Sequence, residues 1–275
     1  IQPMTPNGTY YEVSMTQFTQ DLGLKDGFGN PMLTTVWGYN GSYPGPTFEA
    51  RRNIPITVKW KNELMDANGP LPHLLPVDTS IHWAMPENWP YSGVPLVTHL
   101  HGGHVESASD GNPNAWFTPG FTQKGSYWSQ QVYNYPNNQE ASTIWYHDHA
   151  LGITRLNVYA GLAGYYIVRD EWEDNLNLPS GNYEIPIVIQ DRMFTQDGEL
   201  YYPSTPEEAG QPTPTVLPEM FGDFILVNGK TWPVLNVEPR KYRFRFLNGS
   251  DSRFYKLYFN NNIAFVQIGT DGGFL

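Results

Sequence analysis

The sequence predicts an all-β protein of the sandwich or barrel type, on three observations. The 275 residues include 26 glycines and 24 prolines, which are spread along the whole chain. Between them lie short runs rich in Val, Ile, Thr and aromatic residues, the types that favour strands. Asn-Gly and Asp-Gly dipeptides, typical of hairpin turns, recur between these runs. Helical signal is weak, and only one short helical turn is predicted, near residues 151–156.

The runs predict strands in the following order along the chain: Tyr10–Thr16, Thr34–Tyr39, Ile54–Lys61, Val94–Leu100, Ser126–Tyr135, Thr143–His147, Ala160–Val168, Glu184–Gln190, Tyr242–Leu247 and Phe254–Phe259. Turn dipeptides separate these runs, again in order: Asn7-Gly8, Asn40-Gly41, Asn68-Gly69, Asp110-Gly111, Asp197-Gly198, Asn228-Gly229 and Asn248-Gly249. A chain of many short strands joined by such turns is typical of a sandwich or a barrel.

A domain boundary is predicted in residues 169–180, where a charged stretch precedes a Pro-Ser-Gly turn. Residues 1–172 then form one β domain of ordinary size, and residues 173–275 form a second. Residues 202–219 contain five prolines and predict a long surface connection. This leaves the second domain few strands, so we expect an incomplete sheet and self-association or a partner segment. The apolar side chains expected to be exposed are Phe254, Tyr258, Phe265 and Phe274.

Charge and composition exclude several classes of function. Lys and Arg number 16 against 27 Asp and Glu, a formal net charge of −11, which opposes binding to nucleic acid or to an anionic membrane. No apolar run approaches the roughly 18 residues of a membrane span. Cysteine is absent, so this chain holds no disulfide, thiolate zinc site, iron–sulfur cluster or cysteine nucleophile. The chain begins at Ile1 rather than Met, which we interpret as a processed or trimmed start.

Four of the seven histidines form two His-x-His pairs, His99 with His101 and His147 with His149. Random placement would give only about 0.2 such pairs per chain. On a strand, residues i and i+2 face the same side, so each pair can direct two imidazoles at one ion or at two neighbouring ions. Four neutral nitrogen donors suit copper, zinc, iron or nickel. The alternative is that these are ordinary polar strand residues facing solvent or a satisfied core.

The other polar candidates have less specific patterns. His104 follows a double glycine and is either a further ligand or a solvent-facing or hydrogen-bonding residue. His73 and His82 lie in Pro-rich and Trp-rich loops, and we interpret both as structural. Asp110 precedes Gly111, so it is either a turn residue or a carboxylate that relays protons near bound oxygen. Asp148 alternates with the second histidine pair and is predicted to face away from it.

These histidines stand within longer motifs, and together the motifs cover nearly the whole chain. The first pair continues into Gly102-Gly103 and, further on, Asp110-Gly111-Asn112-Pro113-Asn114-Ala115-Trp116-Phe117, and the second lies in Trp145-Tyr146-His147-Asp148-His149. Further motifs are Trp37-Gly38-Tyr39-Asn40-Gly41, Thr154-Arg155-Leu156-Asn157, Glu238-Pro239-Arg240 and Gly269-Thr270-Asp271-Gly272-Gly273. The combination resembles the multicopper oxidases, in particular the bacterial spore-coat laccases and the bilirubin oxidases.

The resemblance implies a cupredoxin-like Greek-key β-sandwich followed by part of a second cupredoxin-like domain. It implies oxidation of phenolic or other aromatic compounds, or of metal ions, with reduction of dioxygen to water at a trinuclear copper cluster. By the same resemblance, His99 is a ligand of the type 2 copper, and His101 and His147 are ligands of one type 3 copper. His149 is then a ligand of the other type 3 copper, and Asp110 the acidic residue that assists proton delivery. Relatives are extracellular, periplasmic or placed on spore coats.

One departure from the family pattern limits what the chain can do alone. Members bind the type 1 copper through a His-Cys-His motif, and complete the cluster through a His-x-x-His-x-His motif, both in their last domain. Neither motif occurs here. The resemblance therefore implies the N-terminal portion of a three-domain oxidase that contributes half of the trinuclear cluster. The alternative is an isolated half-site that binds copper, or zinc in its place, without turnover.

Overall fold

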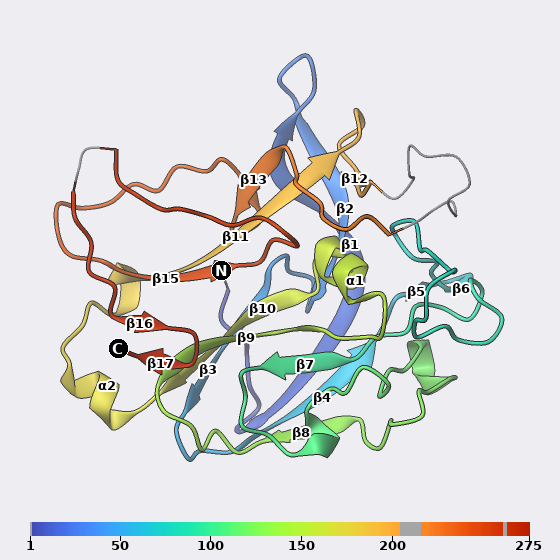
Figure 1. Cartoon of the computed structure of the whole chain (residues 1–275), viewed down its shortest axis with the longest axis horizontal. Helices are drawn as coiled ribbons and strands as arrows, with labels where there is room; N and C mark the ends of the chain where they lie inside the picture. Colours follow the sequence, from blue (N-terminus) through green and yellow to red (C-terminus); the bar gives the residue numbers. More distant parts are fainter. Residues whose placement is uncertain (1, 204–215, 261–262) are drawn as a thin grey trace.

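The computed structural model describes residues 2–203, 216–260 and 263–275, and it confirms the predicted all-β fold (Figure 1). Residues up to about 170 form two four-stranded sheets, in the orders β2-β1-β4-β8 and β3-β10-β9-β7. The strands of the first sheet are β1 (Tyr10–Lys25), β2 (Pro31–Tyr39), β4 (Ile56–Asn62) and β8 (Val132–Tyr135). Those of the second sheet are β3 (Gly45–Arg51), β7 (Thr98–His101), β9 (Ser142–Asp148) and β10 (Ala163–Arg169).

Aromatic side chains fill the space between these two sheets. Tyr39 and Trp60 of the first sheet meet Tyr146 of the second, with ring centroids 4.8 and 5.8 Å apart. Phe48 lies beside the rings of Trp60 and Tyr146 and is also buried. Aromatic pairs of this kind contribute about 0.5–1.5 kcal/mol each beyond the burial of apolar area. Because residues alternate along a strand, burying Tyr146 inward directs the next residue of β9, His147, to the opposite face of the sheet.

A third sheet, formed by residues 184–248, packs against the first half of the chain (Figure 1). Its strands are β11 (Glu184–Phe194), β12 (Leu200–Tyr201), β13 (Phe224–Val227), β14 (Lys230–Thr231) and β15 (Arg243–Asn248). Short hairpins pair β5 (Met65–Asp66) with β6 (Gly69–Pro70) and β16 (Gly269–Thr270) with β17 (Gly273–Phe274). Within the described residues the α-helices are α1 (Thr154–Ala160) and α2 (Glu171–Asn175), and single 3-10 turns cover Ser107–Ser109, Pro119–Phe121 and Gly181–Tyr183. No helix of the described residues is long and apolar enough to cross a membrane.

A buried cluster of ion pairs joins the third sheet to the first half. Glu173 of α2 accepts hydrogen bonds from the guanidinium groups of Arg243 and Arg245 on β15, at 2.6 and 2.7 Å. Glu184 of β11 accepts from Arg169 of β10 at 2.7 Å and from Arg245 at 2.6 Å. The predicted boundary at residue 172 therefore falls inside α2, beside the contacts that connect the two halves.

Nine of the ten predicted strands overlap strands of the structure. The prediction for Phe254–Phe259 was wrong, because this segment forms no strand hydrogen bonds and Phe254 is 94% exposed. β7 begins at Thr98 rather than Val94. Pro95 has no N–H to donate, Leu96 pairs with Phe117 outside this sheet, and the N–H of Val97 binds the Asp148 side chain. The sequence-based prediction missed β3, because prolines in and around this segment obscure the alternation of apolar and polar residues. The predicted helical turn is α1, displaced by a few residues.

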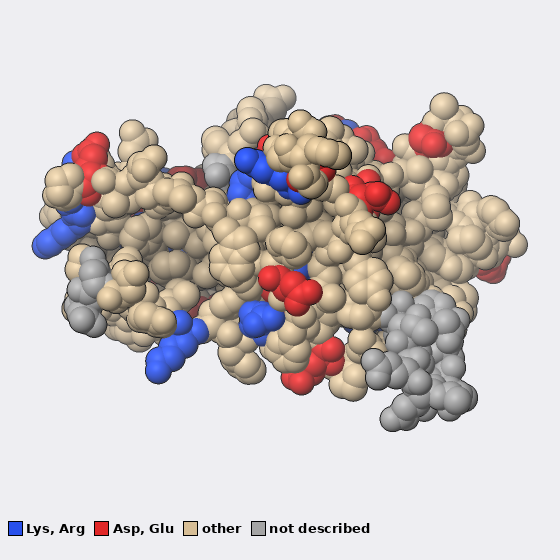
Figure 2. Space-filling model, turned by 90° about the horizontal axis from the view of Figure 1, so that it is seen from above, with Lys and Arg blue, Asp and Glu red and all other residues tan. Residues whose placement is uncertain are grey.

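The predicted exposure of apolar side chains is confirmed for three of four residues. Phe254, Tyr258 and Phe265 are exposed, whereas Phe274 packs on Trp172 with ring centroids 5.1 Å apart. Most of the predicted connection over residues 202–219 lies outside the described residues. On the face in Figure 2, basic side chains are scattered among acidic and uncharged ones and form no continuous basic surface over the described part.

Candidate metal centre

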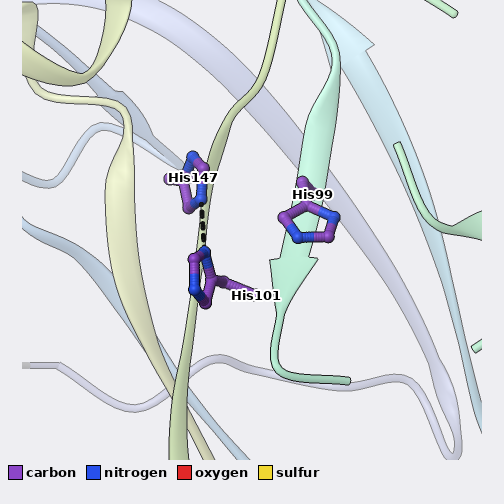
Figure 3. A group of neighbouring side chains, drawn as sticks. All are labelled: His99, His101 and His147. Atoms are coloured by element: carbon purple, nitrogen blue, oxygen red, sulfur yellow. Dashed lines mark hydrogen bonds between the residues drawn. The ribbon is translucent and has the colours of Figure 1, made fainter. Parts of the chain in front are cut away.

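The two His-x-His pairs lie on neighbouring antiparallel strands. In the register of β7 with β9, His99 is opposite His147 and His101 is opposite Trp145. Figure 3 shows the rings of His99, His101 and His147 gathered on one side of these strands. One ring nitrogen from each of the three lies within 4.8 Å of the others. The structure therefore brings both residues of the first pair and one residue of the second pair together.

The fourth histidine, His149, follows β9 and lies next to this group. Its ring stacks on that of His99, with centroids 4.6 Å apart and planes inclined by 23°. Its ring centroid is 5.7 Å from that of His147. The four imidazoles thus form one contiguous cluster drawn from two segments almost 50 residues apart in sequence.

Backbone carbonyls fix the orientation of three of these rings. The Nδ1 atoms of His99, His147 and His149 lie 2.5, 2.7 and 2.8 Å from the carbonyl oxygens of Asp110, Asp148 and Gly111 respectively. A carbonyl oxygen only accepts hydrogen bonds, so each Nδ1 carries the proton. The Nε2 lone pairs of His99 and His149 are left available, whereas Nε2 of His147 faces Nδ1 of His101. An Nδ1 bound to a carbonyl is the usual arrangement of a metal-binding histidine.

His101 is oriented differently from the other three. Its Nδ1 lies 3.2 Å from Nε2 of His147, as the dashed line in Figure 3 marks. Two nitrogen ligands about 2.0–2.1 Å from one tetrahedral ion are roughly 3.3 Å apart. This pair of nitrogens therefore has the spacing of two ligands of a single metal ion, with His101 presenting Nδ1 and His147 presenting Nε2.

Burial keeps the central histidines in the neutral form that binds metals. His147 is buried, and its pKa falls to about 3, chiefly through desolvation and then through the three neighbouring imidazoles. The pKa of His99 is also lowered, mainly by burial, although its hydrogen bond to Asp110 opposes this. Protons therefore compete weakly with a metal ion for these two rings near neutral pH.

The donor set fits copper. Imidazole nitrogens suit copper and zinc. The group contains no thiolate, a ligand type that would favour softer metal ions. The indole of Trp145 stacks on His147 at 4.2 Å and lies 5.2 Å from His101, which shields one side of the cluster. His147 is 5% exposed, whereas His101 is exposed. The cluster is thus closed around His147 and open around His101.

The loop Asp110–Gly111 has a part in the site that the sequence did not reveal. Its two consecutive carbonyls hold His99 and His149, while the Asp110 carboxylate lies 3.5 Å from His99 Nδ1. Gly111 has a φ of +74°, and a Cβ there would be 2.1 Å from the carbonyl oxygen of Thr98. Only glycine fits, so the Asp-Gly dipeptide holds two of the clustered histidine rings as well as making a turn.

The remaining candidates lie outside the cluster. Asp148 faces away from the histidine rings, as predicted, and is fully buried. His104 is exposed and donates its backbone N–H to Gln139 at 2.8 Å. His82 is exposed, whereas His73 is hydrogen-bonded to Leu75 and to Asn157 of α1.

Comparison with known proteins identifies the family. A family model described as multicopper oxidase matches residues 28–85 and 91–173, the part that carries all four histidines. The chain belongs to the multicopper oxidase family. It is 50% identical to a laccase of Bacillus stratosphericus over 274 residues and 48% identical to a laccase of Bacillus subtilis over 269 residues. The resemblance inferred from the motifs is thereby confirmed.

Comparison with solved structures of multicopper oxidases confirms that this chain has a cupredoxin-like fold. A multi-copper oxidase from Pediococcus acidilactici superposes with a TM-score of 0.72 at 30% identity, covering 100% of this chain and 48% of that one. The matches cover 98% and 97% of this chain but only 51% and 50% of the two Bacillus laccases. The chain thus spans about half the length of the multicopper oxidases that it matches.

Proposed function

We propose that this chain is the N-terminal part of a laccase-like multicopper oxidase and contributes half of its dioxygen-reducing copper cluster. The observation that carries the proposal is the pairing of His101 Nδ1 with His147 Nε2 at 3.2 Å, inside a cluster whose other rings are anchored by carbonyls. Copper, when bound, would supply one-electron redox chemistry and a binding site for dioxygen. The domains are proposed as residues 1–172 and 173–275.

Each histidine has a proposed place in the centre. His101 and His147 share one type 3 copper, which their spacing supports. His99 binds the type 2 copper through Nε2, and His149 binds the other type 3 copper through Nε2, since the Nδ1 of each ring is committed to a carbonyl. Zinc fits the same donors and is the proposed substitute ion.

Asp110 is the proposed proton donor of the site. Its side chain is 43% exposed, so the carboxylate exchanges protons with solvent. One carboxylate oxygen also lies 3.5 Å from His99 Nδ1, which places it at the edge of the cluster. A carboxyl group in contact with both water and the centre can hold a proton at Oδ1 and pass it on.

Turnover needs groups that this chain lacks. Electrons from a phenolic, aromatic or metal-ion reductant enter the relatives' cluster through a cysteine-bound copper, and this sequence has no cysteine. The alternative proposal is a half-site that binds copper or zinc without turnover. Self-association, or a segment carrying the other ligands, is proposed to cover the exposed Phe254 and Tyr258. An extracellular, periplasmic or spore-coat location is proposed from the family alone.

The test is a copper titration of the purified chain with two histidine variants. We expect about one or two Cu²⁺ ions per chain and no blue-copper absorption, since no thiolate is present. His147→Ala should lower the affinity at least about tenfold, whereas His104→Ala should leave it unchanged. Equal affinity of the His147→Ala variant and the unsubstituted chain would refute the centre. Rapid oxidation of a phenol by the homogeneous chain would refute the need for a further domain.

A further inference from the structure

One buried carboxylate ties together the two segments that carry the histidines. Oδ2 of Asp148 accepts the N–H of Val97, which directly precedes β7, and Oδ1 accepts the N–H of Ala150, each at 3.0 Å. The carbonyl of Val97 in turn accepts the N–H of His149 at 2.8 Å. The Asp148 side chain is 0% exposed. Its position therefore fixes where the first histidine pair lies relative to the second.

The third donor to this carboxylate comes from α1. Nδ2 of Asn157 donates to Oδ1 of Asp148 at 2.7 Å, the shortest of the three contacts, and also lies 3.5 Å from the carbonyl of Pro95. Asn157 is itself 0% exposed. Because its amide nitrogen faces the carboxylate, its amide oxygen points the other way and needs a donor of its own.

His73 supplies that donor. Its Nε2 lies 2.9 Å from Oδ1 of Asn157, and its Nδ1 lies 2.9 Å from the backbone nitrogen of Leu75. The amide oxygen can only accept, so Nε2 carries the ring proton and Nδ1 accepts from Leu75. Burial lowers the pKa of His73 to about 4, which keeps the ring in this neutral form. The ring also packs on Trp37, with centroids 4.6 Å apart.

We propose that Asn157 and His73 are positioning residues of the metal centre. His73 orients the amide of Asn157, Asn157 orients the carboxylate of Asp148, and Asp148 holds the two histidine pairs at the spacing that lets them bind metal together. The three residues come from a loop, from α1 and from β9, and their side chains meet behind the face that carries the ligand rings. The inference rests on the proposed metal centre and explains how a chain of hydrogen bonds maintains it.

A purely structural role of this chain of hydrogen bonds predicts a different result. Losing a buried hydrogen bond lowers the stability of the fold wherever it lies, but it leaves metal affinity and metal spectra unchanged once the protein is folded. A positioning role predicts that a folded variant binds metal more weakly and in an altered geometry. Changes in residues that support metal ligands typically cost 10–100-fold in affinity.

The experiment measures Cu²⁺ binding to the full 275-residue chain by calorimetry, and the electron paramagnetic resonance spectrum of the Cu²⁺-loaded protein. The variants are Asn157→Leu, which removes the donor to Asp148, and His73→Leu, which removes the donor to Asn157. His73→Gln is the conservative variant, since its side-chain amide N–H replaces the ring N–H. Tyr166→Phe is the matched control, because it loses a buried 2.6 Å hydrogen bond to Asn137 instead.

We expect Asn157→Leu and His73→Leu to weaken Cu²⁺ affinity about 10–100-fold and to change the copper hyperfine splitting. His73→Gln and Tyr166→Phe should keep the affinity and the spectrum of the unsubstituted chain. If Asn157→Leu does not fold, the comparison of His73→Leu with His73→Gln decides. Unchanged affinity and spectra in folded Leu variants would overturn this inference alone. Absence of Cu²⁺ binding by the unsubstituted chain would overturn the metal centre and this inference with it.

Discussion

Gly111→Ala is a sharp test of how the centre is built, because the substituted residue contributes no side chain to the site. The new Cβ would lie 2.1 Å from the carbonyl oxygen and 2.6 Å from the carbonyl carbon of Thr98, and both atoms belong to β7. The loop must move away from β7 to relieve this overlap. The same movement lengthens the hydrogen bonds from His99 to Asp110 and from His149 to Gly111.

The expected magnitude has two parts. A non-glycine residue at a positive φ costs about 1–2 kcal/mol, which any such substitution shows. Losing the carbonyl partners of two ligand rings should in addition weaken Cu²⁺ affinity about 10–100-fold. Gly41→Ala is the matched control, since Gly41 has a φ of +66° and no atom within 4 Å of an added Cβ.

The assay combines chemical denaturation with a Cu²⁺ titration of both variants. Both should lose stability, and Gly111→Ala more so because of the overlap with Thr98. Only Gly111→Ala should lose copper affinity. If the two variants bind copper with the affinity of the unsubstituted chain, the carbonyls of this loop do not orient the ligands and the reasoning is refuted.

Three further predictions concern stability, each measured by chemical denaturation. The pKa of His73 is about 4 in the folded chain and roughly 6.5 in the unfolded chain, so unfolding takes up a proton between pH 4 and pH 6.5. The free energy of unfolding therefore falls as the pH falls through this range, by about 1.4 kcal/mol per pH unit. His73→Gln should make that slope shallower by up to this amount, and parallel profiles would contradict the assignment. Glu173→Ala removes the 2.6 and 2.7 Å contacts to Arg243 and Arg245 but leaves them Glu184, so it should cost about 1.5–3 kcal/mol, a loss below about 0.5 kcal/mol being evidence against a buried cluster. Tyr146→Phe leaves the Pro46 carbonyl without its 2.6 Å donor and should cost about 1–3 kcal/mol, whereas a neutral effect would mean that water replaces the hydroxyl.

Strand alternation explains why so much of the site could be predicted from sequence. A His-x-His pair on a strand places both rings on one face, and the buried Tyr146 next to His147 occupies the opposite face. The same alternation correctly placed Asp148 on the opposite side. The antiparallel register of β7 with β9 places His99 opposite His147, and this pairing forms the cluster.

Loops and isolated segments resisted prediction for physical reasons. The carbonyls of Asp110 and Gly111 bind ligand rings through the backbone, which every residue has, so no side-chain type signals their role. Gly111 was recognised only as half of a turn dipeptide, although a contact with β7 also requires it. The segment Phe254–Phe259 has the composition of a strand, but composition does not provide the neighbouring strand that a ladder needs.

The orientation of the four rings also indicates from which side the centre is completed. Carbonyls of the chain hold His99, His147 and His149, and Trp145 covers the outer face of His147. His101 is the exposed member of the four, and its Nδ1 is directed at His147 rather than at a carbonyl. A metal ion would take the place of the proton between those two nitrogens, so ion binding and the orientation of His101 are coupled. We therefore expect additional ligands to approach from the side of His101.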